Sequence, residues 1–120
     1  MGRFIARRGE IWLINVMGKT RPALVISHDG INATDGAVVI PASSLFHSEQ
    51  EDLIVLTEAD GVSEYCYLVV EKLSFVRYFR KEKDQKPFIK RLGAATPETM
   101  RKVEFQLTAL FQLKPAEEVL

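Results

Sequence analysis

The sequence predicts a mainly β fold with α structure: a small, strongly bent barrel of short strands that ends in one helix. Three observations predict it. Five or six runs of apolar, β-branched and aromatic residues are all short, tight turns separate them, and the run with clear helical spacing comes last. A sheet of such short strands would expose its edges, and closing it into a barrel removes them.

The first two predicted strands form a hairpin. Glu10–Val16 and Pro22–Ser27 are apolar, β-branched or aromatic runs, and a turn that contains Gly18 joins them. Because proline cannot donate to a sheet ladder, Pro22 is expected at the first residue of a strand or at an edge. Arg21 then lies at the mouth of the strand, beside the turn.

The middle of the chain predicts the remaining strands. The turn dipeptides Asp29-Gly30 and Asp35-Gly36 bracket a loop, after which a third strand is expected over Ala37–Ile40 and should stop at Pro41. Further strands are predicted over Leu53–Leu56, Tyr65–Leu73 and, as a bent or bulged continuation, Phe75–Phe79.

A helix is predicted from Pro97 to about Leu113. Thr96 is a good N-cap, Pro97 suits the first helical position, and Glu98 favours the positive end of the helix dipole. An apolar stripe should pack on the sheet and comprises Met100, Val103, Leu107, Leu110 and Phe111. Phe105 lies on the opposite arc, where it indicates either a partner surface or an ordinary exposed phenylalanine.

Length and composition bound the function. With 120 residues, the chain can bury one hydrophobic core and is too short for two, so residues 1–120 are expected to form a single domain. No apolar run approaches the roughly 20 residues of a membrane helix, and residues 1–8 show no signal-peptide pattern. A cytoplasmic protein without a membrane partner is therefore expected.

Charge is balanced overall but unevenly distributed. Residues 49–64 carry acidic side chains and no lysine or arginine, whereas basic side chains crowd residues 74–91. The basic stretch indicates either a phosphate-attracting surface or a solvated loop that protects a sheet edge. Cys66 is the only cysteine, which excludes an internal disulfide, and its apolar neighbours predict a buried thiol rather than a nucleophile.

Six segments occur in a characteristic order along the chain: Arg8-Gly9-Glu10-Ile11-Trp12, Thr20–Ser27, Asn32, Val39–Ser44, Glu71-Lys72-Leu73 and Thr96–Val103. Together they resemble the MazF/PemK toxins, a likeness that covers nearly the whole chain, from Arg8 to Leu113. The resemblance implies an SH3-like barrel that forms a homodimer and acts as the toxin of a type II toxin–antitoxin pair.

The resemblance also implies an endoribonuclease that cuts single-stranded RNA without a metal or other cofactor. The ribose 2′-OH attacks the adjacent phosphate and gives a cyclic phosphate and a free 5′-OH. Such a site needs donors for the charge of the phosphorane, a group that takes the 2′ proton and a group that protonates the departing oxygen. The implied protein partner is a cognate antitoxin with an acidic, partly disordered tail.

Three catalytic residues carry over from the family. Arg21 matches its catalytic arginine and is expected to clamp the scissile phosphate. Ser43 falls where the family has a catalytic threonine, so its hydroxyl is expected to hydrogen-bond the phosphate or relay a proton. Glu71 matches an acidic position and either orients Arg21 or acts as a base. Without the resemblance, these are a solvated arginine, a turn serine and half of a surface ion pair.

The residues expected to bind RNA are Lys19, Thr20, Ser44, His47, Lys72 and Arg77. His47 lies close in sequence to Ser43 and is the better placed of the two histidines for proton transfer, although a plain loop histidine is the alternative. Lys72 and Arg77 depart from the family pattern, and their added charge would bind phosphate. The loop Asn15–Thr20 lacks the longer segment that in many members folds over the active site.

Two other functions fit the same sequence. One is a barrel that binds RNA or a protein target without cleaving RNA. The other is a gyrase toxin similar to CcdB, but those toxins end in tryptophan-glycine-isoleucine, whereas this chain ends Glu117–Leu120 and has its tryptophan at Trp12. That difference argues against gyrase as the target.

Overall fold

A computed structural model of the protein describes residues 5–16, 18–44, 53–80 and 86–113. The strands are β1 (Glu10–Val16), β2 (Lys19–Val25), β3 (Gly36–Ser43), β4 (Ile54–Leu56), β5 (Cys66–Leu68), β6 (Ser74–Arg77) and β7 (Phe88–Ala94). The helices are α1 (Asp29–Asn32) and α2 (Pro97–Phe111), with 3-10 turns η1 (Glu58–Asp60) and η2 (Val70–Lys72).

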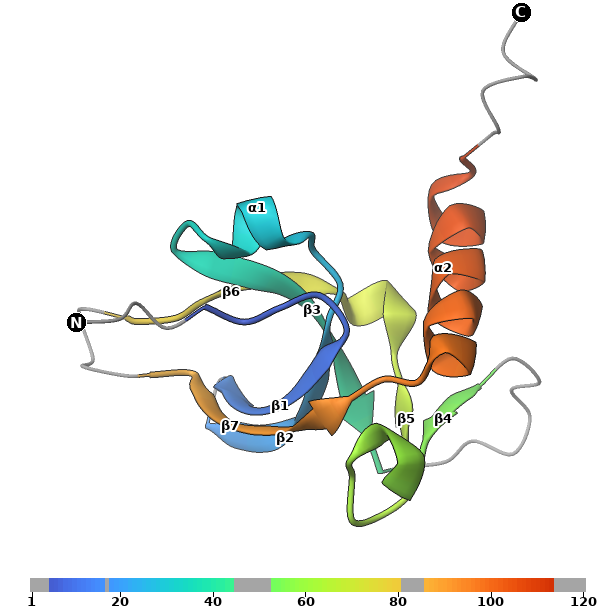
Figure 1. Cartoon of the computed structure of the whole chain (residues 1–120), viewed down its shortest axis with the longest axis horizontal. Helices are drawn as coiled ribbons and strands as arrows, with labels where there is room; N and C mark the ends of the chain where they lie inside the picture. Colours follow the sequence, from blue (N-terminus) through green and yellow to red (C-terminus); the bar gives the residue numbers. More distant parts are fainter. Residues whose placement is uncertain (1–4, 17, 45–52, 81–85, 114–120) are drawn as a thin grey trace, which may run out of the picture.

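The strands form one antiparallel sheet that curls into a half-barrel, which confirms the predicted fold class (Figure 1). Neighbouring strands follow the order β4-β5-β3-β2-β1-β7, and β6 pairs with β3 off this path. In the described part of the chain this path stays open, with β4 at one end and β7 at the other. Helix α2 lies against the end of the sheet that carries β4 (Figure 1).

The predicted hairpin is confirmed, but its second strand begins at Lys19 rather than at Pro22. Pro22 pairs with Leu13 of β1 inside the strand. The ladder between β2 and β3 ends at Ala23, so β2 has an open edge on its β3 side at Pro22. A proline is tolerated there because that edge needs no N–H donor.

The third strand was predicted to stop at Pro41, but it continues to Ser43. Pro41 is the last residue of β3 that pairs with β2, and from Ala42 onward the strand pairs with β5. The carbonyl of Pro41 accepts a hydrogen bond from the Val69 amide at 2.9 Å. Pro41 therefore lies where β3 changes partner, and the change brings β5 beside the end of β3.

The long strand predicted over Tyr65–Leu73 was wrong. Only β5 is extended, and the chain then turns through η2 before β6 begins. The continuation predicted over Phe75–Phe79 is confirmed in part as β6, which pairs with β3, whereas Tyr78 and Phe79 lie beyond the end of this strand. Strand β7 was not predicted because charged side chains interrupt its apolar pattern. The short helix α1 was not predicted because it begins with turn residues.

Two core clusters lie on the two faces of the curled sheet. One contains Ile11 and Leu24 and includes Val103 of α2, while the other contains Ile14 and Phe88. The Thr96 hydroxyl caps α2 by accepting a hydrogen bond from the Thr99 amide.

The buried part of the apolar stripe of α2 is shorter than predicted. Met100, Val103 and Leu107 pack on the first core cluster, whereas Leu110 and Phe111 are 44% and 56% exposed. The stripe is lost there because the helix extends past the sheet (Figure 1). No helix in the described ranges is long and apolar enough to span a membrane.

Candidate active site

A groove with a volume of about 710 Å³ opens where β2 begins and β3 ends, and we call it the strand-end groove. Four stretches of the chain form it: the β1–β2 hairpin, the end of β3, the segment between η1 and β5, and β7. Its lining residues are Leu13, Thr20, Arg21, Pro22, Ala42, Ser43, Ser44, Gly61, Val62, Ser63, Glu64, Tyr65, Cys66, Lys90, Arg91 and Leu92.

Arg21 and Ser43 reach the strand-end groove from different strands. Arg21 lies in β2, beyond the end of the β2–β3 ladder at Ala23 and Pro41. Ser43 is the last residue of β3, in the part of that strand that pairs with β5. The fold thus brings a guanidinium and an alcohol from distant segments to one groove.

The side chain of Arg21 is half-buried. Within the described ranges its charge has no ion-pair partner. Other arginines are paired: Arg91 Nε lies 2.8 Å from Glu10 Oε2, and Arg8 Nη2 lies 3.0 Å from Glu104 Oε2. Arginine keeps its charge at any working pH and offers a planar fork of donors that matches a phosphate. Arg21 is therefore suited to bind an anion in the groove.

Two of the six residues predicted to bind RNA line the strand-end groove, namely Thr20 and Ser44. Lys19 precedes Thr20 in β2 and is exposed, but it is not part of the lining. His47 lies outside the described residues.

The structure does not bring Lys72 or Arg77 to the groove. Lys72 is exposed on η2. Arg77 lines a separate small pocket of about 210 Å³, and its Nε lies 3.8 Å from Asp35 Oδ2. Lys72 belongs to η2 and Arg77 to β6. Both elements follow β5 in the chain, and neither contributes a residue to the groove lining.

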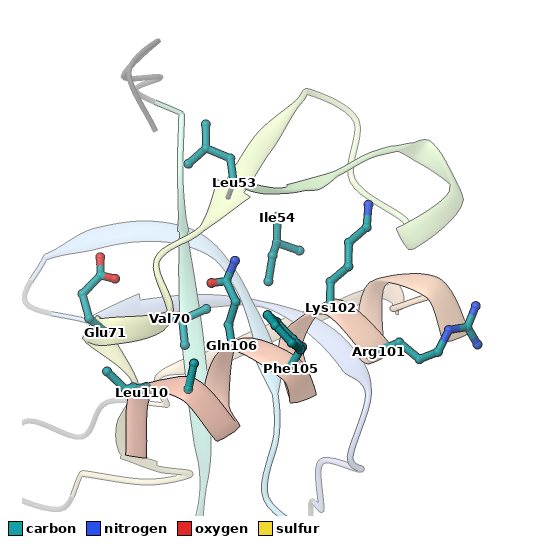
Figure 2. A pocket seen from close by; sticks show the side chains of 10 residues that line it. Leu53, Ile54, Val70, Glu71, Arg101, Lys102, Phe105, Gln106 and Leu110 are labelled. Carbon is teal, nitrogen blue, oxygen red and sulfur yellow. The ribbon is translucent and has the colours of Figure 1, made fainter. Parts of the chain in front are cut away.

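Glu71 is also placed away from Arg21 and Ser43. It is exposed on η2 and lines a second pocket of about 780 Å³, which we call the helix-side pocket. Figure 2 shows Glu71 at one end of this pocket and Arg101 of α2 at the other. The lining residues are Leu53, Ile54, Val70, Glu71, Arg101, Lys102, Phe105, Gln106, Ala109 and Leu110. Within one chain, Glu71 therefore does not share the groove with Arg21.

Two cations and a carboxylate of the strand-end groove were missed as site residues. Lys90 and Arg91 belong to the basic stretch of the sequence, and the signal that places them is β7 itself, where Lys90 lies opposite Leu13. Glu64 is the single carboxylate in the lining as far as residues 5–16, 18–44, 53–80 and 86–113 form it. It lies in the acidic stretch of the sequence, where no local pattern distinguishes it from its neighbours.

The wall formed by residues 61–66 is fixed by Asp60. This carboxylate is 2% exposed and accepts hydrogen bonds from the Thr57 amide at 3.0 Å, the Thr96 amide at 2.9 Å and the Thr99 hydroxyl at 3.0 Å. It thereby joins η1 to the start of α2. A buried carboxylate is stable only with such partners, so the segment after it has a defined position.

Cys66 is buried at the edge of the groove. Burial raises the pKa of its thiol, and the nearby Asp60 carboxylate raises that pKa further. The side chain therefore stays a neutral thiol near neutral pH, whereas a nucleophilic cysteine reacts as the thiolate. The predicted packing role of Cys66 is consistent with this position.

Residues 7–111 match the sequence profile of a family described as the PemK-like, MazF-like toxin of type II toxin–antitoxin systems. The chain belongs to this family. The match covers most of the chain, as the resemblance in sequence predicted.

Solved structures of MazF toxins share the fold of this family member. A MazE–MazF structure from Deinococcus radiodurans is 19% identical, with a TM-score of 0.72 over 93% of this chain and 100% of that chain. An endoribonuclease in complex with its cognate antitoxin from a mycobacterial species is 17% identical, with a TM-score of 0.72 over 94% and 99%. The toxin MazF-mt6 of Mycobacterium tuberculosis is 11% identical, with a TM-score of 0.71 over 88% and 99%. The half-barrel with a C-terminal helix is the MazF fold.

Proposed function

We propose that this MazF/PemK toxin is a metal-independent endoribonuclease that cleaves single-stranded RNA in the strand-end groove. The observation that supports this most directly is the presence of Arg21 and Ser43 in one groove, supplied by two strands. An endoribonuclease of the same fold is among the related structures.

In the proposed reaction, Arg21 binds the scissile phosphate and stabilises the negative charge that grows on its oxygens. The ribose 2′-oxygen forms a bond to phosphorus and loses its proton, while the bond from phosphorus to the 5′-oxygen breaks and that oxygen gains a proton. The products are a 2′,3′-cyclic phosphate and a 5′-OH. Ser43 donates a hydrogen bond to the phosphate or relays the proton to the departing oxygen.

We assign the Glu64 carboxylate as the base that accepts the proton of the 2′-OH. Among the described residues it is the single carboxylate that lines the groove, whereas Glu71 lines the helix-side pocket. A carboxylate in reach of the 2′-OH takes the proton as the bond to phosphorus forms.

We also propose that the toxin works as a homodimer and is silenced by a cognate antitoxin. The related structures include complexes of MazF with MazE. An acidic antitoxin tail suits a groove that holds Arg21, Lys90 and Arg91, since opposite charges across an interface favour association. Light scattering of the purified chain measures the dimer directly.

The test is cleavage of single-stranded RNA by the purified toxin in the presence of a chelator. The native chain should give products that end in a cyclic phosphate and a 5′-OH, while Arg21→Ala and Ser43→Ala should give far fewer. Arg101→Ala, in the helix-side pocket, is the matched control and should cleave like the native chain. RNA binding without cleavage would instead identify a non-catalytic binding module. Undiminished cleavage by both groove variants would overturn the assigned site.

A further inference from the structure

Tyr65 is a large aromatic side chain that lies in the strand-end groove and remains 69% exposed. Its neighbour in sequence, Cys66, is buried at the start of β5, so the chain turns the tyrosine outward at the point where the strand begins. The same groove holds Arg21 and Ser43. An exposed ring beside a proposed phosphate-binding site has the form of a base-stacking platform.

The backbone that carries Tyr65 has a fixed position. Gly61 has a φ of 100°, and a Cβ added to it would lie 2.6 Å from the Leu92 carbonyl oxygen and 2.7 Å from Gly93 Cα. This close approach ties the segment to β7, while Asp60 ties it to the start of α2 through two hydrogen bonds, from the Thr96 amide and the Thr99 hydroxyl. A ring on such an anchored segment loses little conformational freedom when a base stacks on it.

Lys90 adds a cation to the same groove. It is exposed and lies opposite Leu13 in the β1–β7 ladder, and both residues line the groove. Within the described ranges Lys90 has no ion-pair partner, in contrast to Arg91, which is paired with Glu10. An aromatic ring and a cation together are the elements that bind one nucleotide of a single strand.

We infer that Tyr65 and Lys90 bind the nucleotide next to the cleaved linkage, with the Tyr65 ring stacked on its base and Lys90 on its phosphate. This inference rests on the proposed function, since it places the nucleotide beside Arg21 and Ser43. Tyr65 is then a determinant of which base is preferred at one position of the RNA. Stacking on an aromatic ring tolerates every base but favours those that stack most strongly, so the preference should be graded.

The test compares Tyr65→Leu with Tyr65→Phe on a mixed single-stranded RNA, with cleaved ends read by sequencing. Tyr65→Leu should raise KM on the order of tenfold and flatten the preference at one neighbouring position, because leucine has no ring to stack. Tyr65→Phe should behave like the native chain, because it keeps the ring. Phe105→Leu removes an exposed ring from the helix-side pocket and should change neither KM nor preference.

A binding measurement separates this inference from the proposed function. A single-stranded DNA analogue that carries 2-aminopurine cannot be cleaved through a 2′-OH, and its fluorescence falls when the base stacks. The native chain and Tyr65→Phe should quench it, Tyr65→Leu should not, and Lys90→Met should bind it more weakly and with a shallower salt dependence. Quenching without RNA cleavage by the native chain would sink the nuclease alone. Equal behaviour of Tyr65→Leu and the native chain in both assays, or an equal loss in Phe105→Leu, would overturn the inference.

Discussion

The strand-end groove and the helix-side pocket are two hollows of similar size with different chemistry. Their volumes are about 710 and 780 Å³. The groove gathers Arg21, Ser43 and Lys90 from three strands, whereas the pocket is lined mainly by apolar side chains of α2, β4 and η2, with charges at its rim (Figure 2). Size therefore does not distinguish them, and the site is identified by the convergence of a cation and an alcohol.

The two regions also differ in how they are built. The walls of the groove are strand ends and a segment tied down by Asp60, which hold side chains in a defined geometry. The pocket lies beside the part of α2 that carries the exposed Phe105 and Leu110. Catalysis needs preorganised groups, and a binding surface does not need them to the same degree.

The largest effect is expected for the central cation of the groove. Arg21→Ala should lower kcat/KM for RNA by about 2 to 4 kcal/mol in transition-state stabilisation, because a charge-assisted contact with the phosphate is lost. Arg21→Lys should recover only part of this, since lysine keeps the charge but loses the planar fork. Steady-state cleavage kinetics measure both. An equal loss in Arg101→Ala would remove the distinction between groove and pocket.

The next largest effect concerns the wall of the groove. Asp60→Ala should lower the free energy of unfolding by about 3 kcal/mol, because three donors lose a charged acceptor in a buried place. Glu71→Ala in the helix-side pocket should change it by less than about 0.5 kcal/mol, as expected for an exposed side chain. Urea unfolding followed by circular dichroism compares them. Similar values for the two variants would contradict the proposed role of Asp60.

A smaller effect is expected at Tyr78, which belongs to neither region. Its hydroxyl donates to the Asn32 carbonyl at 2.6 Å and accepts from the Ala6 amide at 3.2 Å. Tyr78→Phe should therefore lower the free energy of unfolding by about 1 to 2 kcal/mol. Cleavage of RNA by the folded variant should be unchanged.

Tyr78 also predicts a dependence of stability on alkaline pH. Burial raises the pKa of its hydroxyl, the Glu10 and Asp29 carboxylates add to this, and the bond from Ala6 opposes it. The unfolded chain then ionises first, near pH 10, so stability is fully present below that pH and falls as pH rises toward the raised pKa. Tyr78→Phe should show a shallower fall in urea titrations across this range, and an unchanged slope would contradict the account.

The smallest effect is expected at Phe105. Its side chain is 75% exposed, so Phe105→Ser should change the free energy of unfolding of the chain by less than about 0.5 kcal/mol. A larger loss that shrinks as the protein is diluted would show that this face is covered by a partner copy, because dilution dissociates the native dimer as well. Unfolding at several protein concentrations measures it.

Local patterns predicted the parts of the fold that depend on local chemistry. The β1–β2 hairpin follows from two apolar runs around Gly18, and the start of α2 follows from Thr96 and Pro97. The apolar run Tyr65–Leu73 did not predict how the chain passes from β5 to β6. The 3-10 turn η2 interrupts this run, after β5 has paired with the end of β3. Strand β7 was missed because its exposed Lys90 and Arg91 interrupt the apolar pattern.

The candidate site was predictable only in part. The resemblance to the family indicated Arg21 and Ser43, and the structure places both in one groove. The same resemblance indicated Glu71, which the turn of η2 directs to the helix-side pocket. Glu64 and Tyr65 carry no local signal, because their place in the groove depends on the tether at Asp60 and on the contact between Gly61 and Gly93.

A double-mutant cycle on RNA cleavage in chelator tests the joint action of Arg21 and Ser43 most directly. Kinetics of Arg21→Ala, Ser43→Ala and the double variant give the coupling between the two side chains. If both act on one phosphate, the double variant should lose at least about 1 kcal/mol less than the sum of the single losses. Losses that add within about 0.3 kcal/mol, or a Ser43→Ala variant as active as the native chain, would contradict a shared site.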